Sequence, residues 1–367
     1  MNVKLKKLSE QVMVITGASS GIGLVTARMA AKRGAKLVVA ARAEDALRQL
    51  VEEIRAAGGE AEYVVADVGR EEDVWNIAKT AHERFGGFDT WVNNAGVSIY
   101  GRILDHSTED MRRLFDTNFW GTVYGSQIAA IHLRRHGGAL INVGSTVSDR
   151  AIPIQGVYSA SKHAVKGFTD ALRMELEAEG APISVTVVKP GSIDTPFPEN
   201  AKNLMEKEPT LPPPVYAPEV VAEAILHCAE HPVRDVFAGG GGKAMSVMEK
   251  YTPRLGDKIM ENFMIEGQKM DEPAGHPDDN GLYQASGQLK ERSGRPSYVS
   301  ESSLYTKASL HPLLTGALVF GAGLALAALW RPWEANGRRN GSNGHHRGAN
   351  GSANGAWPSA SGLPAEG

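Results

Sequence analysis

Val12-Met13-Val14-Ile15-Thr16-Gly17-Ala18-Ser19-Ser20-Gly21-Ile22-Gly23 is the stretch of sequence that determines the fold expected for this chain. A short β-branched run leads into a glycine-rich turn, and residues up to about Arg33 follow with helical spacing. The start of a helix offers unpaired N–H groups and a partial positive charge, so a phosphate can bind there, close to glycines that lack a Cβ. A tight connection without a ligand is the alternative, because the spacing departs from the usual G-x-G-x-x-G pattern.

Further β-branched runs alternate with helix-patterned stretches as far as about Ala238. This alternation predicts an α/β fold, a doubly wound parallel sheet of about seven strands with crossover helices. The expected strands are Val12 to Thr16, Leu37 to Ala41, Glu62 to Ala66, Thr90 to Asn93, Ala139 to Val143, Ser184 to Lys189 and Asp235 to Ala238.

The composition of the 367 residues excludes several classes of protein. Hydrophobic residues make up 42% and charged residues 22%, which excludes a wholly disordered chain. A net charge of -3 provides no cationic field for nucleic acid. The single cysteine, Cys228, cannot form an intrachain disulfide, and no Cys/His cluster has the spacing of a zinc site, so we expect no metal and a reducing compartment.

Several motifs occur together in one order along the chain: the glycine-rich turn, Asn93-Asn94-Ala95-Gly96, Ser145 and Tyr158-x-x-x-Lys162. In this the chain resembles the short-chain dehydrogenase/reductase family over residues 8–264, and the joint match is far more specific than any single motif. The resemblance implies one Rossmann-type catalytic domain that binds a nicotinamide dinucleotide. It also implies that relatives often assemble, so a homo-oligomer is a further expectation.

Tyr158 and Lys162 are four residues apart on an expected helix, so their side chains lie on one face. A fixed ammonium favours phenolate, and we therefore expect a lowered pKa for Tyr158, which would move a proton near neutral pH. Ser145 closes the fifth expected strand and would hydrogen-bond the substrate oxygen. The resemblance adds Asn118 to these three as a residue that keeps Lys162 and a proton-relay water in position.

The cofactor preference is predicted from the end of the second expected strand, where a carboxylate would bind the ribose 2′-OH and repel a 2′-phosphate. The chain has Ala41-Arg42 there, so NADP(H) is favoured over NAD(H), although Ser20 stands where many NADP-preferring relatives have a basic residue. A solvated surface role is the alternative for Arg42. With the residues that the family resemblance implies beyond the turn and Arg42, the expected cofactor-binding residues are Gly17, Ser19, Ser20, Gly21, Ile22, Gly23, Arg42, Asp67, Val68, Asn94, Ala95, Gly96, Tyr158, Lys162, Pro190, Gly191, Ile193 and Thr195.

The substrate is expected to be a lipophilic ketone or aldehyde, or the corresponding alcohol. Residues 196–218 are proline-rich and predict a lid, with a plain surface loop as the alternative. The expected pocket walls are largely apolar: Ser98, Ile99, Tyr100, Ile152, Pro153, Ile154 and Phe197. Two other functions stay open, a cofactor-binding membrane scaffold without turnover and an epimerase or dehydratase on the same fold.

The C-terminal part changes in composition. Residues 265–307 are polar and interrupted by prolines, which predicts a linker. Residues 308–330 contain no Asp, Glu, Lys or Arg and are long enough for a membrane helix, which needs about 20 residues, with a helix buried against the domain as the alternative. Residues 331–367 are rich in Gly, Asn and Ser and predict a disordered tail. Because the cofactor is cytoplasmic, the sequence predicts a membrane-anchored protein whose catalytic domain faces the cytoplasm.

Overall fold

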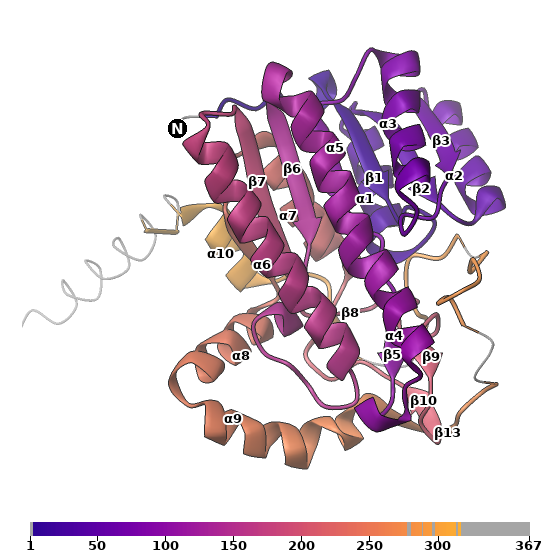
Figure 1. The fold of residues 1–367 in the computed structure, drawn as a ribbon, viewed down its shortest axis with the longest axis vertical. Helices are drawn as coiled ribbons and strands as arrows, with labels where there is room; N and C mark the ends of the chain where they lie inside the picture. The colour runs from indigo at the N-terminus through magenta and orange to yellow at the C-terminus, as the bar shows by residue number, and fades with distance from the viewer. Residues whose placement is uncertain (1–2, 277–279, 288, 296–297, 313–314, 317–367) are drawn as a thin grey trace, which may run out of the picture. The chain divides into compact units, whose positions relative to one another are not determined.

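The computed structural model describes residues 3–276, 280–287, 289–295, 298–312 and 315–316. Its centre is a parallel sheet of seven strands in the order β12-β7-β6-β4-β1-β2-β3 (Figure 1). The order reverses next to β1, which is the doubly wound arrangement, and the predicted fold class is confirmed. The strands are β1 (Val12–Thr16), β2 (Lys36–Ala41), β3 (Ala61–Val65), β4 (Thr90–Asn93), β6 (Gly138–Val143), β7 (Ile183–Pro190) and β12 (Asp235–Ala238).

Helices cover both faces of this sheet, which is why its strands are almost continuous apolar runs. Figure 1 shows α3, α5 and α6 in front of the strands, and apolar residues of these helices form one core cluster with the sheet. Residues of α1, α2 and α7 form the other cluster on the opposite face. The helices are α1 (Gly21–Lys32), α2 (Glu44–Ala56), α3 (Glu71–Phe85), α4 (Thr108–Phe115), α5 (Gly121–His136), α6 (Gly156–Ala178) and α7 (Pro218–Glu230).

Smaller sheets lie beyond the main sheet and involve segments far apart in the sequence. Their strands are β5 (Ile99–Tyr100) with β9 (Lys202–Asn203), β10 (Lys207–Pro209) with β13 (Lys269–Pro273), and β14 (Val299–Ser300) with β11 (Val215–Tyr216) and β8 (Ser192–Ile193). Helices α8 (Gly240–Tyr251) and α9 (Pro253–Ile259) lie below the main sheet in Figure 1. Thus β13 and β14, which lie within the predicted polar linker 265–307, pair with strands of the domain.

The C-terminal hydrophobic segment lies mostly outside the described residues, as does the whole predicted tail, 331–367. Its first residues, 308–310, end the helix α10 (Leu304–Leu310). Leu310 is only 8% exposed and belongs to the core cluster around α1 and α7, so the domain uses the start of the segment predicted to span a membrane. No helix within the described ranges combines the length and the hydropathy that a membrane crossing requires.

Candidate active site

The glycine-rich turn connects β1 to α1 through an unusually close approach of two backbones. Gly17 and Gly21 have φ values of +68° and +52°, which favour glycine. A Cβ at Gly23 would lie 2.1 Å from the Gly17 carbonyl oxygen. Asn94, at the end of β4, secures the turn because its side-chain amide donates to the carbonyl oxygens of Thr16 (2.9 Å) and Gly17 (3.2 Å). The turn is therefore shaped by glycine at three positions, and it leads directly into the N-terminus of α1.

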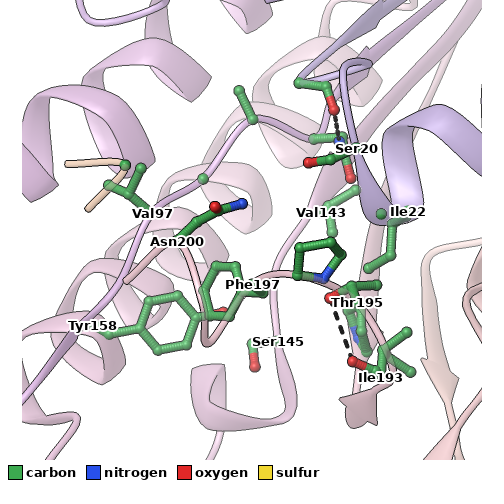
Figure 2. Close-up of a pocket in the computed structure, with 18 of the residues that line it drawn as sticks. Ser20, Ile22, Val97, Val143, Ser145, Tyr158, Ile193, Thr195, Phe197 and Asn200 are labelled. Atoms are coloured by element: carbon green, nitrogen blue, oxygen red, sulfur yellow. Dashed lines mark hydrogen bonds between the residues drawn. The ribbon is translucent and has the colours of Figure 1, made fainter. Parts of the chain in front are cut away.

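A cavity of about 270 Å³ extends from this turn along the carboxyl ends of the strands. Figure 2 shows Ser20 and Ile22 on one side of it and Tyr158 on the other. All the cofactor-binding residues predicted from the sequence line this cavity except Gly23, whose part is to let the turn and α1 approach each other. Ser145, Tyr158 and Lys162 line the same cavity.

The residues present fit a dinucleotide. The cavity is continuous from Arg42 and Asp67 at one end to Tyr158 and Lys162 at the other, and the N-terminus of α1 lies between. Thr117 also lines it, and its buried hydroxyl has no hydrogen-bond partner in the described part of the chain, so a bound molecule could supply one.

Tyr158 and Lys162 lie on the first turns of α6, as predicted. The Lys162 ammonium donates to the Val143 carbonyl oxygen at 2.8 Å, at the end of β6, and lies 5.8 Å from the centre of the Tyr158 ring. Burial lowers the pKa of Lys162 to about 8. Both side chains are thus placed within one pocket, with the ammonium fixed by the strand that precedes Ser145.

The prediction of a lowered pKa for Tyr158 is wrong for this arrangement. Burial raises the pKa of Tyr158 to about 12, and the hydrogen bond with Ser145 opposes only part of that effect. The phenolate would lose its hydration in this pocket, while the Lys162 ammonium donates to the Val143 carbonyl oxygen. At neutral pH the phenol therefore keeps its proton, the state from which it can act as an acid.

Ser145 follows β6 and begins the short 3-10 helix Thr146–Ser148. Its hydroxyl oxygen accepts a hydrogen bond from the Val147 N–H at 3.3 Å, which leaves the hydroxyl proton available to donate. Figure 2 shows Ser145, Tyr158 and Phe197 around one part of the cavity. The Tyr158 and Phe197 ring centres are 5.4 Å apart.

Asn118 lies behind the cavity wall and does not line it. It is fully buried in a π-helical turn, Asp116–Trp120, a distortion that is frequent at functional sites. Its side chain accepts from the Val97 N–H (2.8 Å) and donates to the Val97 carbonyl oxygen (2.9 Å) and to Ser161 (3.1 Å). Asn118 thus connects Val97, which follows β4, to Ser161 of α6, the residue before Lys162.

Arg42 and Asp67 line the adenosine end of the cavity, and a second arginine that no motif marked, Arg113, binds Asp67. Arg113 donates to the Asp67 carboxylate at 2.5 Å. Burial raises the pKa of Asp67, but the hydrogen bonds from Arg113 and from the Gly69 N–H outweigh it and leave the pKa lowered. Arg42 donates to backbone carbonyl oxygens of residues 281–284, so it is held in place and is no freely solvated surface side chain.

Three of the seven residues predicted as substrate walls line the cavity. Tyr100, Ile152 and Phe197 line the cavity, whereas Ser98, Ile99, Pro153 and Ile154 do not. The proline-rich segment 196–218 contributes wall residues, and the later parts of the chain contribute others that no motif marked. These additional wall residues are Pro196, Asn200, Leu211, Pro212, Met245, Met264, Gly281, Ala285 and Ser286.

Comparison with known proteins agrees with this geometry. The family model of the short chain dehydrogenases matches residues 11–206. The chain is 50% identical over 322 residues to the uncharacterised oxidoreductase YxnA of Bacillus subtilis, covering 87% of this chain and 90% of that relative. It is 35% identical over 236 residues to the 11-beta-hydroxysteroid dehydrogenase-like protein 4A of Arabidopsis thaliana, covering 64% of this chain and 76% of the relative.

Two solved structures are similar in fold. One is a short chain dehydrogenase/reductase from Burkholderia phymatum in complex with NAD, with a TM-score of 0.61 and 26% identity over 70% of this chain and 96% of that one. The other is an alcohol dehydrogenase from Thermococcus sibiricus complexed with 5-hydroxy-NADP, with a TM-score of 0.55 and 29% identity over 62% and 95% of the two chains. These matches agree with the sheet order, the glycine-rich turn and the cluster of Ser145, Tyr158 and Lys162. They show that the chain belongs to the short-chain dehydrogenase/reductase family of oxidoreductases, which act on CH–OH groups with NAD(P).

Proposed function

We propose that this protein is an NADP(H)-dependent oxidoreductase that interconverts a lipophilic ketone or aldehyde and its alcohol, with Tyr158 as the acid and base. The observation that carries the proposal is that Ser145, Tyr158 and Lys162 line the same cavity as the residues expected to bind the dinucleotide. Ligands of open α/β folds bind at this carboxyl edge of the sheet.

Tyr158, Ser145 and Lys162 have different roles in carbonyl reduction. A bound reduced nicotinamide would supply the hydride. Tyr158 donates its proton to the carbonyl oxygen, and the raised pKa of the phenol ensures that this proton is present at neutral pH. Ser145 donates a hydrogen bond to the same oxygen and orients it. Lys162 favours the phenolate that remains until solvent returns the proton, and the reverse sequence serves alcohol oxidation.

Arg42 supports the preference for NADP(H). Its guanidinium lines the adenosine end of the cavity, and the preceding residue, Ala41, has no carboxylate to repel a phosphate. We expect Arg42→Asp to move the ratio of kcat/KM values towards NAD(H) by at least tenfold. Arg48→Asp is the matched control, because Arg48 is an exposed side chain of α2 that pairs with Glu44. An unchanged ratio in Arg42→Asp would remove Arg42 from the site.

The apolar walls support a lipophilic substrate, because Ile152, Phe197, Leu211, Met245 and Met264 offer no partners for sugars or acids. Relatives named 11-beta-hydroxysteroid dehydrogenases point to steroid-like alcohols as one class to test. A panel of ketones, aldehydes, sterols and secondary alcohols should be screened by the absorbance of NADPH.

The same screen separates the other functions. A scaffold would bind NADPH without turnover of any compound. An epimerase or dehydratase would convert its substrate while the absorbance of the cofactor stays constant. Steady consumption or formation of NADPH with at least one lipophilic member of the panel supports the proposal.

We also propose that the C-terminal segment anchors the protein at the membrane, with the catalytic domain in the cytoplasm. The absence of charged residues from the segment supports a membrane anchor. Since α10 ends at Leu310, residues 311–330 would form the membrane span, and Trp330 and Trp333 would lie near the C-terminal end of that span. Fractionation of broken cells should place the full chain in the membrane pellet and a chain ending at Gly316 in the supernatant. Full-length protein in the supernatant would refute the anchor.

A further inference from the structure

A segment far beyond the part matched by the family model lies against the cofactor side of the cavity. It consists of residues 280–287 and 289–295, here named the strap. At the adenosine end, Arg42 donates to the carbonyl oxygens of Gly281 (2.5 Å) and Gln284 (2.9 Å). Arg113 donates to the Leu282 carbonyl oxygen at 3.1 Å. The strap therefore binds both Arg42, which lines this end of the cavity, and Arg113, which pairs with Asp67.

The other end of the strap contacts the turn at which a pyrophosphate would bind. The Gly21 N–H, at the start of α1, donates to the Lys290 carbonyl oxygen at 2.9 Å, and Ser20 and Lys290 form an isolated parallel bridge. Ser293 then donates through its hydroxyl (2.5 Å) and its N–H (3.2 Å) to the buried carboxylate of Asp194. Because Ile193 and Thr195, which flank Asp194, line the cavity, the strap reaches from Arg42 past the glycine-rich turn to this further part of the wall.

Besides these hydrogen bonds, the strap is attached to the domain by the apolar side chain of Leu282 and by ion pairs. Leu282 has no exposed surface and packs in a cluster with Val97, Leu114 and Val157. Outside the cavity, Glu291 pairs with Arg28 at 2.8 Å and Lys290 pairs with Glu199 at 3.0 Å. Partly exposed ion pairs contribute little to stability, so Leu282 is the main apolar attachment of the strap.

We propose that the strap is a cover over the bound dinucleotide and has to open before the cofactor can enter or leave. Gly281, Ala285 and Ser286 form part of the cavity wall, so the strap encloses the space without filling it. This proposal rests on the proposed use of a dinucleotide but not on the 2′-phosphate or on the substrate. It assigns to these residues a part of the binding site that lies outside the family's matched region, residues 11–206.

Stopped-flow fluorescence of NADPH and of NADH with the full chain tests the cover, and no substrate is needed. If the strap has to open first, the observed binding rate of the wild type levels off at high cofactor concentration, because opening becomes limiting. Leu282→Ser should make both association and dissociation at least tenfold faster and make the observed rate linear in cofactor concentration. A change that merely weakened the site would accelerate dissociation alone.

Leu304→Ser is the matched control, since Leu304 belongs to α10 and is 83% exposed, and its rates should equal those of the wild type. Ser293→Ala provides a second, milder opening of the strap if Leu282→Ser folds poorly, with an expected threefold acceleration of both rates. Linear binding by the wild type together with variant rates within twofold of it would overturn the cover. Absence of turnover in the substrate panel, with these binding rates as predicted, would refute the proposed chemistry and leave the cover intact.

Discussion

Gly23→Ala is the substitution whose effect is most directly determined by the structure. Gly23 is the third residue of α1, and an alanine Cβ there would lie 2.1 Å from the Gly17 carbonyl oxygen and 2.6 Å from the side-chain nitrogen of Asn94. The oxygen belongs to the backbone of the turn, so no side-chain rotation can relieve the contact. The turn and the helix have to move apart.

The matched control is Gly167→Ala in α6, where an added Cβ meets no atom within 4 Å. Alanine in an open helix position stabilises by about 1 kcal/mol relative to glycine. Forcing a methyl group into packed atoms costs about 3 kcal/mol at the upper end of the usual range, and a backbone contact belongs there. We therefore expect a loss of about 2 kcal/mol at Gly23 and a gain of about 1 kcal/mol at Gly167 in the free energy of unfolding.

Urea denaturation of the two variants and the wild type measures these differences, and titration with NADPH measures the consequence for the site. Gly23→Ala should bind NADPH at least tenfold more weakly, whereas Gly167→Ala should bind it as the wild type does. Equal stability of the two variants, with unchanged NADPH affinity in Gly23→Ala, would show that this close approach does not exist in the protein.

Two further predictions concern the reaction centre. Ser145→Ala should lower kcat by about 10²-fold, as for the loss of one oxyanion donor, and leave the Kd for NADPH unchanged; a kcat within twofold of the wild type would remove Ser145 from the reaction. Burial lowers the pKa of Lys162 from 10.5 to about 8, so between these values the unfolded chain binds more protons than the folded one, and stability rises with pH. Urea denaturation should show that Lys162→Met loses this rise of up to about 3 kcal/mol relative to the wild type; parallel pH profiles of the two proteins would contradict the burial of the ammonium.

The central sheet could be predicted from the sequence because its strands are buried on both faces. β1, β4 and β12 have the predicted bounds, and the other four differ by a residue or so at their ends. The turn and the Ser145, Tyr158 and Lys162 cluster could also be predicted, because glycine positions and helical spacing are local features. The order of the strands brings the turn and this cluster together, because it places the strands that precede them near each other, with their carboxyl ends at one edge of the sheet.

The strap could not be predicted, because Arg42, Arg113 and Gly21 bind its backbone carbonyl oxygens, which any sequence provides. Its polar composition therefore resembled that of a linker. The sequence also could not predict that the pKa of Tyr158 is raised, because the spacing shows that an ammonium is near but does not show how completely the phenol is buried. A charge-free run suits a membrane helix and a buried helix alike, so the sequence could not decide that Leu310 packs in the core.

The most direct test of the central claim is the single-turnover rate of NADPH oxidation by Tyr158→Phe, with the best carbonyl compound from the panel. Phenylalanine keeps the ring that packs against Phe197 and removes only the hydroxyl that donates the proton. We predict a rate at least 10²-fold below that of the wild type, with NADPH binding unchanged within twofold. A rate within threefold of the wild type would show that the proton comes from another group and would contradict the proposed mechanism.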